Sequence, residues 1–295
     1  MTKQFNIINT HNTELEFDVI VAMAVYIEDR LDWVQEAVFS ILNQTYEDYL
    51  FAIVIDGDID DDIHRFLIDI SKAYGRTVVI DGKRNVGLSA CMNYVIDWSM
   101  QYKPKYFFRM DADDISAANR LTTQVEYLNR HSNISILGSA LVEVNEQGIP
   151  VGKRKLPLLH DEIIRFLPKR CSINHPTVAI RYNVFSDDHR YRNELKNTQD
   201  YFLWAELAGA GYKFANLSEQ LLSFRRVNDF YKRRALSKSF NEFKARLFTM
   251  KILHRYTVGN LVYAFAVLTL RLMPSAIVKL AYKVDRIVLE KLVRH

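Results

Sequence analysis

Short apolar runs alternate with amphipathic stretches through the first half of the chain, and this order limits the possible folds more than any other feature of the sequence. The apolar runs cover residues 18–23, 50–55, 77–80 and 106–110, and an aspartate follows each of the last three. Between the runs, apolar residues recur every three or four positions, as on one face of a helix. This order predicts an α/β fold in which helices flank both faces of a mostly parallel central sheet.

The same patterns place the remaining elements. Expected helices cover residues 31–42, 63–70, 88–100, 121–128 and 200–210, and further strands cover 134–137, 141–144, 213–216 and 221–225. The stretch 153–197 shows no clear periodicity and is expected to be irregular. From residue 237 onward the pattern is helical and basic.

Charge is distributed unevenly along the chain. Residues 225–295 hold 16 Lys/Arg but only 4 Asp/Glu, whereas the chain as a whole has a net charge of +4. The uncharged segment Leu261–Leu270 is half the roughly twenty residues that a membrane-spanning helix needs. Apolar residues combined with excess Lys/Arg predict helices that lie on a membrane surface without crossing it. An ordinary helical cap on the core is the alternative.

Cysteine usage indicates the compartment. Cys91 and Cys171 are the only two cysteines, too few for a disulfide framework or a zinc site. A reducing, cytoplasmic setting is therefore expected. The apolar fraction of 49% and the charged fraction of 25% exclude a disordered chain.

Acidic residues follow the second and fourth apolar runs. Asp56 ends the second run, and Asp111-Ala112-Asp113 ends the fourth. In a parallel sheet, ligands bind beyond the carboxyl ends of the strands, so these residues are expected at one edge. Two carboxylates one residue apart can share Mg²⁺ or Mn²⁺, which prefer oxygen ligands. The alternative is a solvated acidic turn that caps the next helix.

Two further segments at this edge carry candidate binding groups. The carboxylate of Asp56 can accept hydrogen bonds from a base or a ribose hydroxyl, although a turn aspartate before Gly57 is the alternative. Arg84 can pair with a phosphate, and Asn85 follows it directly. For Arg84 and Asn85, the alternative is a simple capping loop ahead of the next helix.

Asp200 and His175 are the remaining candidates. Asp200 begins a helical pattern beside aromatic residues, where burial would raise its pKa and help it to accept a proton. Its alternative role is that of a helix-capping aspartate. His175 lies in an apolar stretch and can contact an acceptor or a metal, or be purely structural.

Taken in order, these segments resemble family 2 glycosyltransferases, the inverting nucleotide-sugar enzymes with a GT-A fold. The matching segments are 19–26 (VIVAMAVY), 40–45 (SILNQT), 53–57 (IVIDG), 84–93 (RNVGLSACMN), 111–114 (DADD) with Arg120-Leu121, and 199–204 (QDYFLW). The combination of DG, RMDADD, HPT and FRR is most similar to bacterial exopolysaccharide and O-antigen enzymes of the amylovoran-synthesis type.

The resemblance implies roles for individual residues. It places the nucleotide-sugar against Ala24, Val25, Tyr26, Asp56, Arg84, Asn85, Asp111 and Ala112. It implies that Asp113 is the main metal ligand, assisted by Asp111, and that Asp200 is the catalytic base.

The sequence departs from the family pattern at two places that bear on the chemistry. Gln199 stands where a glutamate usually precedes the base, which affects contacts to the acceptor. Val227-Asn228-Asp229 stands where a metal-binding histidine is often found. The metal is therefore expected to rest on Asp113, the diphosphate and water.

The resemblance further implies three regions and one activity. The regions are an N-terminal extension (1–17), a GT-A catalytic domain (18–226) and a basic, apolar helical region (227–295) that contacts a membrane. The expected activity is inverting transfer of a sugar, from a UDP-linked donor, to a hydroxyl of a lipid-linked glycan in bacterial surface polysaccharide synthesis. Mg²⁺ or Mn²⁺ is the expected cofactor, and the expected location is the inner face of the cell membrane, as a peripheral protein.

Two other functions remain open at this point. A sugar nucleotidyltransferase would share the sheet and the metal, but it normally has a glycine-rich phosphate loop after the first strand, and residues 26–31 contain no glycine. A nucleic-acid-binding protein would use the basic tail. That tail lacks a recognisable motif, and its apolar runs suit lipid better, so no nucleic-acid partner is expected.

Overall fold

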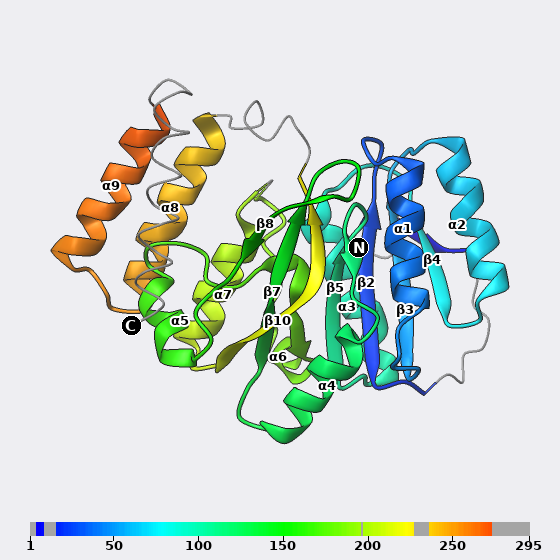
Figure 1. Ribbon diagram of the computed structural model, residues 1–295, viewed down its shortest axis with the longest axis horizontal. Coiled ribbons are helices and arrows are strands. Elements are labelled where there is room, and N and C mark those ends of the chain that lie inside the picture. Colours follow the sequence, from blue (N-terminus) through cyan, green and yellow to red (C-terminus); the bar gives the residue numbers. More distant parts are fainter. Residues whose placement is uncertain (1–3, 9–15, 196, 227–235, 273–295) are drawn as a thin grey trace.

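The computed structural model describes residues 4–8, 16–195, 197–226 and 236–272. Figure 1 shows a central sheet with helices on both sides and a pair of helices, α8 and α9, at the end of the molecule opposite α2. The strands are β1 (Phe5–Ile7), β2 (Val19–Val25), β3 (Tyr49–Asp56), β4 (Thr77–Gly82), β5 (Tyr106–Asp111), β6 (Ile115–Ser116), β7 (Ile136–Val144), β8 (Pro150–Arg154), β9 (Ala179–Arg181) and β10 (Phe214–Arg225).

The helices are α1 (Leu31–Leu42), α2 (Asp61–Ala73), α3 (Leu88–Ser99), α4 (Arg120–Arg130), α5 (His160–Phe166), α6 (Asn183–Ser186), α7 (Gln199–Gly209), α8 (Leu236–Ile252) and α9 (Val258–Leu272). Short 3₁₀ turns cover Met100–Tyr102 and His175–Thr177.

The sheet is built around a parallel block. Its strand order is β1-β4-β3-β2-β5-β9-β7-β10-β6, with β8 paired to β7. Strands β4, β3, β2 and β5 are parallel to one another, and β7 is parallel to β10. Strand β9 pairs antiparallel with both β5 and β7 and so joins the two parallel groups. The expected α/β fold with a mostly parallel sheet is confirmed.

Alternate side chains of each central strand enter different cores. In β2, Val19, Val21 and Met23 pack with the buried faces of α1, α2 and α4. Ile20 and Ala22 pack on the other side with residues of α3, α5 and α7. This two-sided burial explains why the strands are continuously apolar in sequence.

Several expected elements differ in their extent. The expected strand pairs 134–137 and 141–144, and 213–216 and 221–225, are single long strands, β7 and β10. Their mutual register shifts between Leu217 and Gln220 and again before Ser223, so bulges interrupt the apolar pattern that was used to place the strands. The stretch 153–197, expected to be irregular, contains α5, β9 and α6.

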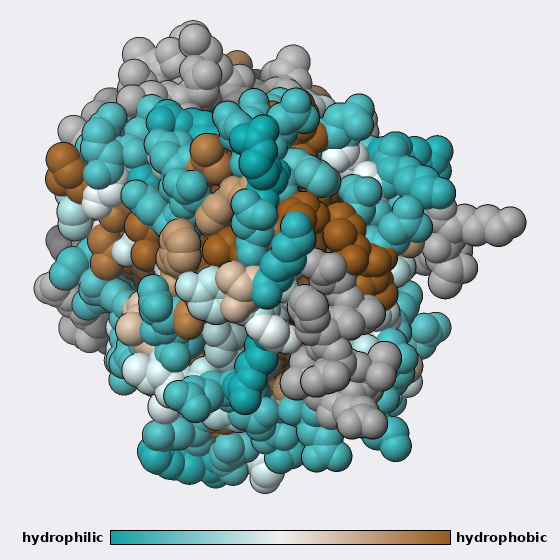
Figure 2. Space-filling view, turned by 90° about the vertical axis from the view of Figure 1, so that its right-hand side faces the viewer, coloured by the Kyte–Doolittle hydropathy of each residue, from teal (hydrophilic) through white to brown (hydrophobic). Residues whose placement is uncertain are grey.

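The end of the molecule near β4 has a mostly hydrophilic surface. Figure 2 faces this end, where hydrophilic residues dominate and apolar residues gather in a band across the middle. Strand β1 pairs antiparallel with β4, from Phe5 opposite Gly82 to Ile7 opposite Ile80. Three residues are too few to show periodicity, so the sequence predicts no strand here.

Helix α8 packs against α7 of the α/β part, and α9 packs against α8, in both cases through aromatic side chains. Phe202 of α7 lies 5.0 Å from Phe248 of α8, and Phe243 of α8 lies 5.0 Å from Phe265 of α9, between ring centroids. None of the helices within the described ranges combines the length and the apolar character that a membrane crossing requires. The part of the predicted membrane-surface region at 227–235 and 273–295 lies outside the described residues.

Candidate active site

The candidate site lies where the direction of strand addition reverses. From β2 the chain adds β3 and β4 on one side and then β5 on the other. Ala24 near the end of β2 is opposite Val54 of β3 and Asp111 of β5. Because β2 separates β3 from β5, these two strands lie about 10 Å apart. Such a switch point is the usual ligand-binding edge of an open α/β sheet.

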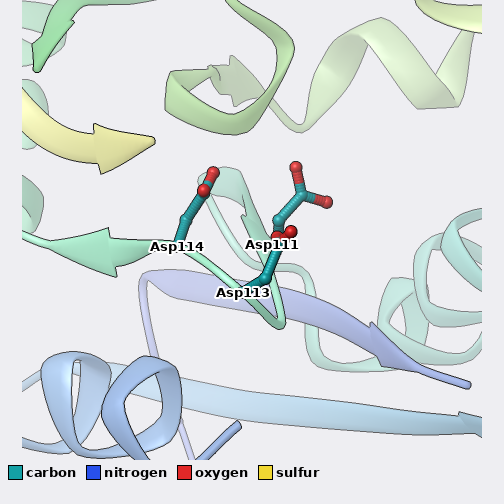
Figure 3. A group of neighbouring side chains, drawn as sticks. All are labelled: Asp111, Asp113 and Asp114. Atoms are coloured by element: carbon teal, nitrogen blue, oxygen red, sulfur yellow. The ribbon is translucent and has the colours of Figure 1, made fainter. Parts of the chain in front are cut away.

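An acidic turn follows β5 at this edge. Asp111, Asp113 and Asp114 each offer a carboxylate oxygen, and these oxygens lie within 4.8 Å of one another. Figure 3 shows the three side chains gathered on the turn that leaves the strand. The turn is short because β6 follows at once and pairs with β10, with Ser116 opposite Leu222.

The three carboxylates have different partners. Asp111 forms a bidentate ion pair with the buried Arg109 two residues earlier, with 2.5 Å between Nη1 and Oδ2. Asp114 is fully buried, and its Oδ1 accepts a hydrogen bond from the Arg225 main-chain N–H at 2.9 Å. Its Oδ2 is buried without a hydrogen-bond partner within the described part of the chain. Among the described side chains, Asp113 has no ion-pair partner, so it is the carboxylate most available to a ligand.

Burial and the crowding of negative charge raise the pKa of two carboxylates of the turn and of one nearby carboxylate. Burial and the neighbouring Asp111 raise the pKa of Asp113 to about 6. Burial, followed by Asp111 and Asp113, raises the pKa of Asp114 well above its usual range. Burial raises the pKa of Asp29 to about 7, with added repulsion from Asp113 and Asp111. Asp29 is a fourth carboxylate near the turn that the sequence analysis did not consider.

The donor chemistry of this turn fits a divalent cation. Carboxylate oxygens are the ligands that Mg²⁺ and Mn²⁺ prefer, and such sites usually keep positions open for water or substrate phosphates. The Oδ2 of Asp114 finds no hydrogen-bond partner among the described residues, and the raised pKa of Asp113 reflects burial and a repulsion from Asp111 that a cation would relieve. Asp113 and Asp111 would hold such a cation.

Asp56 is placed at the same edge and already organises a loop. Its Oδ1 accepts from Val86 N–H at 2.7 Å and its Oδ2 from Gly87 N–H at 2.9 Å, while its carbonyl accepts from the Asn85 side chain at 3.2 Å. Asp56 therefore holds the loop 84–87, for which the sequence left open a simple capping role. Asp56 is only 4% exposed, and its carboxylate also interacts with the buried Cys91 thiol.

Gly57 explains how this loop comes so close to β3. Its φ is +83°, and a Cβ at this position would lie 2.4 Å from the main-chain nitrogen of Asn85. Only glycine allows both this conformation and this approach. Arg84, which follows β4 in the same loop, is exposed and has no ion pair with any described residue.

The end of β2 lies beside the acidic turn, with Ala24 opposite Asp111. Val25 is fully buried in the core beside α1, so only its main chain can face a ligand. Ala24 and Tyr26 are partly exposed, and the Tyr26 N–H is held at 2.9 Å by the Asp29 carboxylate. Ala112 is 5% exposed, between the two acids of the turn.

Asp200 lies in the first turn of α7. Burial raises its pKa, and the positive charge of Arg109 opposes that rise. The Cys171 thiol lies 4.0 Å from its Oδ2. Thr198, directly before the helix, has a left-handed main chain with φ of 63°, which is unusual for a β-branched residue.

His175 and Tyr191 fill the space near Asp200 and Arg109. His175 Nε2 lies 3.0 Å from the Tyr191 hydroxyl, and both residues are buried. Burial, assisted by Arg109, lowers the pKa of His175 well below its usual value, so it is neutral. This neutral, hydrogen-bonded histidine has a structural partner, and none of the described contacts brings it to the acidic turn as a ligand.

Sequence reasoning missed Arg109, Arg225 and Asp29. The partners of Arg225 are distant in sequence, and Arg109 lies inside a strand, where periodicity suggests only apolar contacts. Asp29 lies in a loop whose sequence shows no periodicity. Gln44 belonged to a matching motif but had no assigned role. Its amide donates to Ala117 O at 2.7 Å and accepts from Leu121 N–H at 3.0 Å, so it fixes the segment after the acidic turn.

Comparison with known proteins adds independent information. A family model described as glycosyl transferase family 2 matches residues 20–188. An uncharacterised glycosyltransferase of Haemophilus influenzae is 28% identical, over 89% of this chain and 97% of its own. The amylovoran biosynthesis glycosyltransferase AmsE of Erwinia amylovora is 25% identical, over 90% and 98%. A UDP-Gal:alpha-D-GlcNAc-diphosphoundecaprenol beta-1,3-galactosyltransferase of Escherichia coli is 25% identical, over 89% and 94%.

Solved structures share the fold. S. aureus TarS 1–349, crystallised with UDP-GlcNAc, gives a TM-score of 0.62 at 16% identity, covering 86% of this chain and 72% of that one. The mannosyltransferase PcManGT of Pyrobaculum calidifontis, in complex with GDP-Man and Mn²⁺, gives 0.53 at 14% identity, covering 95% and 83%.

Proposed function

This chain belongs to glycosyl transferase family 2, and we propose that its sheet edge binds a UDP-sugar and transfers the sugar to a hydroxyl of a lipid-linked glycan. The observation that carries the proposal is the acidic turn at the switch point of the sheet, where Asp113 has no ion-pair partner among the described side chains. Membership of this family favours glycosyl transfer over the two alternatives that the sequence left open, nucleotidyl transfer and nucleic-acid binding.

The residues around the turn suit a nucleotide diphosphate. Asp56 fixes the loop that follows β4 at this edge, and the exposed Arg84 of that loop supplies a positive charge. A cation held by Asp113 and Asp111 would neutralise the charge that develops on the departing diphosphate. Fold relatives crystallised with UDP-GlcNAc, or with GDP-Man and Mn²⁺, support a nucleotide-sugar and a divalent ion.

The proposed reaction is a single displacement with inversion at the anomeric carbon. Asp200 takes the proton from an acceptor hydroxyl while that oxygen bonds to the anomeric carbon. The bond from this carbon to the diphosphate breaks at the same time, and the nucleoside diphosphate leaves with both electrons. Burial supports this role, because the raised pKa makes Asp200 a stronger base than an exposed aspartate.

The proposed acceptor carries a lipid, which brings the enzyme to a membrane surface. One relative is named for transfer to a diphosphoundecaprenol-linked sugar. On α9, Val258, Val262 and Phe265 share one face and are 80%, 61% and 55% exposed. Such a face, beside a basic segment, suits the lipid boundary of an anionic leaflet. This supports a peripheral location on the inner face of the cell membrane.

A ligand titration tests the donor site directly. Thermal stability is measured with UDP-, GDP- and dTDP-linked sugars, each with Mn²⁺, with Mg²⁺ or with EDTA. A matching UDP-sugar at about 100 times its Kd should stabilise the fold by about 2.7 kcal/mol, and EDTA should remove most of this effect. Asp113→Asn should lose the metal-dependent part.

The same experiment can overturn the proposal. If the UDP-sugar stabilises the protein equally with EDTA and with Mn²⁺, or fully in Asp113→Asn, the donor site does not depend on a metal held by Asp113. Release of pyrophosphate from a sugar phosphate and a nucleoside triphosphate would favour nucleotidyl transfer over glycosyl transfer.

A further inference from the structure

Arg225, the last residue of β10, gathers three distant segments around the acidic turn. It is 3% exposed, and its guanidinium donates from Nε to the Asp113 carbonyl at 3.0 Å and from Nη1 to the Glu146 carbonyl at 2.9 Å. Its Nη2 forms an ion pair with Glu36 of α1. The guanidinium carbon also lies 5.1 Å from the centre of the Trp33 ring.

The main chain of Arg225 forms a further hydrogen bond to the turn. Its N–H donates to Oδ1 of the buried Asp114 at 2.9 Å. Arg225 therefore fixes Asp113 through its carbonyl and Asp114 through its carboxylate. Since the register of β10 against β6 places Leu222 opposite Ser116, the strand pairing carries Arg225 to the turn.

This arrangement matters because the Asp113 side chain is not held by an ion pair. The direction of its carboxylate depends on the main chain of the turn, and Arg225 is the side chain that holds the Asp113 carbonyl. Arg109 orients Asp111 by its bidentate ion pair. The two candidate ligands are thus each fixed by a different buried arginine.

We propose that Arg225 is a positioning residue that sets the affinity of the acidic turn for its divalent cation. This inference rests on the proposed metal and donor site and adds a residue that makes no contact with the cation itself. Groups that orient metal ligands typically change metal affinity by about 10–100-fold when they are replaced. Lysine cannot substitute, because its ammonium lacks the planar fork that reaches three acceptors at once.

The test compares Arg225→Lys with a matched control, Arg154→Lys. Arg154 lies at the same end of the sheet, pairs with Glu143 at 2.9 Å and stacks 5.0 Å from Phe224, without a contact to the acidic turn. Mn²⁺ binding is measured by calorimetry in the presence of UDP. Arg225→Lys should weaken Mn²⁺ by about 10–100-fold, and saturating Mn²⁺ should restore most of kcat. Arg154→Lys should bind Mn²⁺ like the wild type.

The outcomes separate this inference from the function that it rests on. Failure of the wild type to bind Mn²⁺ with UDP would overturn the proposed donor site. Wild-type binding with unchanged affinity in Arg225→Lys, or with equal losses in both lysine variants, would overturn only the role of Arg225. If Arg225→Lys does not fold, Glu36→Gln removes the half-exposed anchor alone and should still weaken Mn²⁺; an unchanged affinity there would overturn the inference.

Discussion

Arg109 is the charged residue shared by the two parts of the site. It pairs with Asp111 in the acidic turn, and its charge acts on Asp200 and His175 on the other side. Burying this cation without Asp111 would be costly, so the ion pair and the fold depend on each other.

Replacing Asp200 by asparagine should separate activity from stability. We expect kcat to fall by about 10²–10⁴-fold, because the proton acceptor is lost. The folded protein should become more stable at neutral pH, since burial disfavours the ionised carboxyl and the amide carries no charge. Transfer assays and urea unfolding measure the two effects.

Glu206→Gln is the control on the same helix. Glu206 pairs with Arg192, so its replacement should leave transfer intact without stabilising the fold. Full transfer by the Asp200→Asn variant would refute the assignment of the base.

Gly57→Ala should destabilise the protein by about 1–3 kcal/mol, because it combines left-handed strain with a main-chain clash. Gly87 has a similar φ of +87° but open space around it, and Gly75 has open space without positive φ. Urea unfolding should therefore rank the losses as Gly57→Ala, then Gly87→Ala, then Gly75→Ala. Equal losses at the first two positions would show that the approach of the loop to Gly57 is unimportant.

Sequence alone could locate the acids of the site but not their partners. Asp111 and Asp113 follow an obvious strand, and their position in the sheet follows from topology. The contact of Arg225 with Asp114 joins residues 111 positions apart, and the sequence around neither residue predicts it. Val25 shows the opposite case, since its place in a motif gave no sign that its side chain faces the core.

Among the elements, the central strands and the helices around them follow their sequence patterns closely. The expected helix at 31–42 is α1, and the strands β2 to β5 lie within two residues of their expected positions. Each of these helices packs one regular apolar face, and each of these strands is buried on both faces. The long strands β7 and β10 were split in the prediction because Ser139 and the segment 218–220 interrupt their apolar runs. Bulges absorb that interruption in the folded sheet.

Helix α9 offers an element-level test of membrane contact. Val258→Glu with Val262→Glu places two charges on its exposed apolar face and should abolish binding to phosphatidylglycerol-rich vesicles in a flotation assay. Ile149→Glu, at a 59% exposed position on the β7–β8 hairpin, makes the same kind of change elsewhere and should leave binding intact. Unchanged flotation of the α9 variant would remove the proposed role of this face.

At the scale of the whole molecule, the buried acids should make stability depend on pH in an unusual direction. The pKa values of Asp29 and Asp113 are raised to about 7 and about 6, above their values in an unfolded chain. The folded state therefore binds more protons between about pH 4 and pH 7, and this contribution to stability is lost as pH rises through that window.

Urea unfolding without divalent ions should detect this dependence. We expect the contribution of the cluster to grow from pH 8 to pH 5.5, and Asp113→Asn should flatten the dependence. Mn²⁺ with UDP should flatten it as well, because the bound cation replaces the protons. A wild-type pH dependence identical to that of Asp113→Asn would contradict this account.

The short strand β1 has a practical consequence for anyone who trims the chain. Its three residues cover the outer edge of β4, and Gln4 O accepts a further hydrogen bond from Lys83 N–H. A shortened version that starts at Asp18 would leave the amide and carbonyl groups of β4 free to pair with another molecule. Aggregation of such a truncated product would then reflect the missing strand and say nothing about the soundness of the remaining fold.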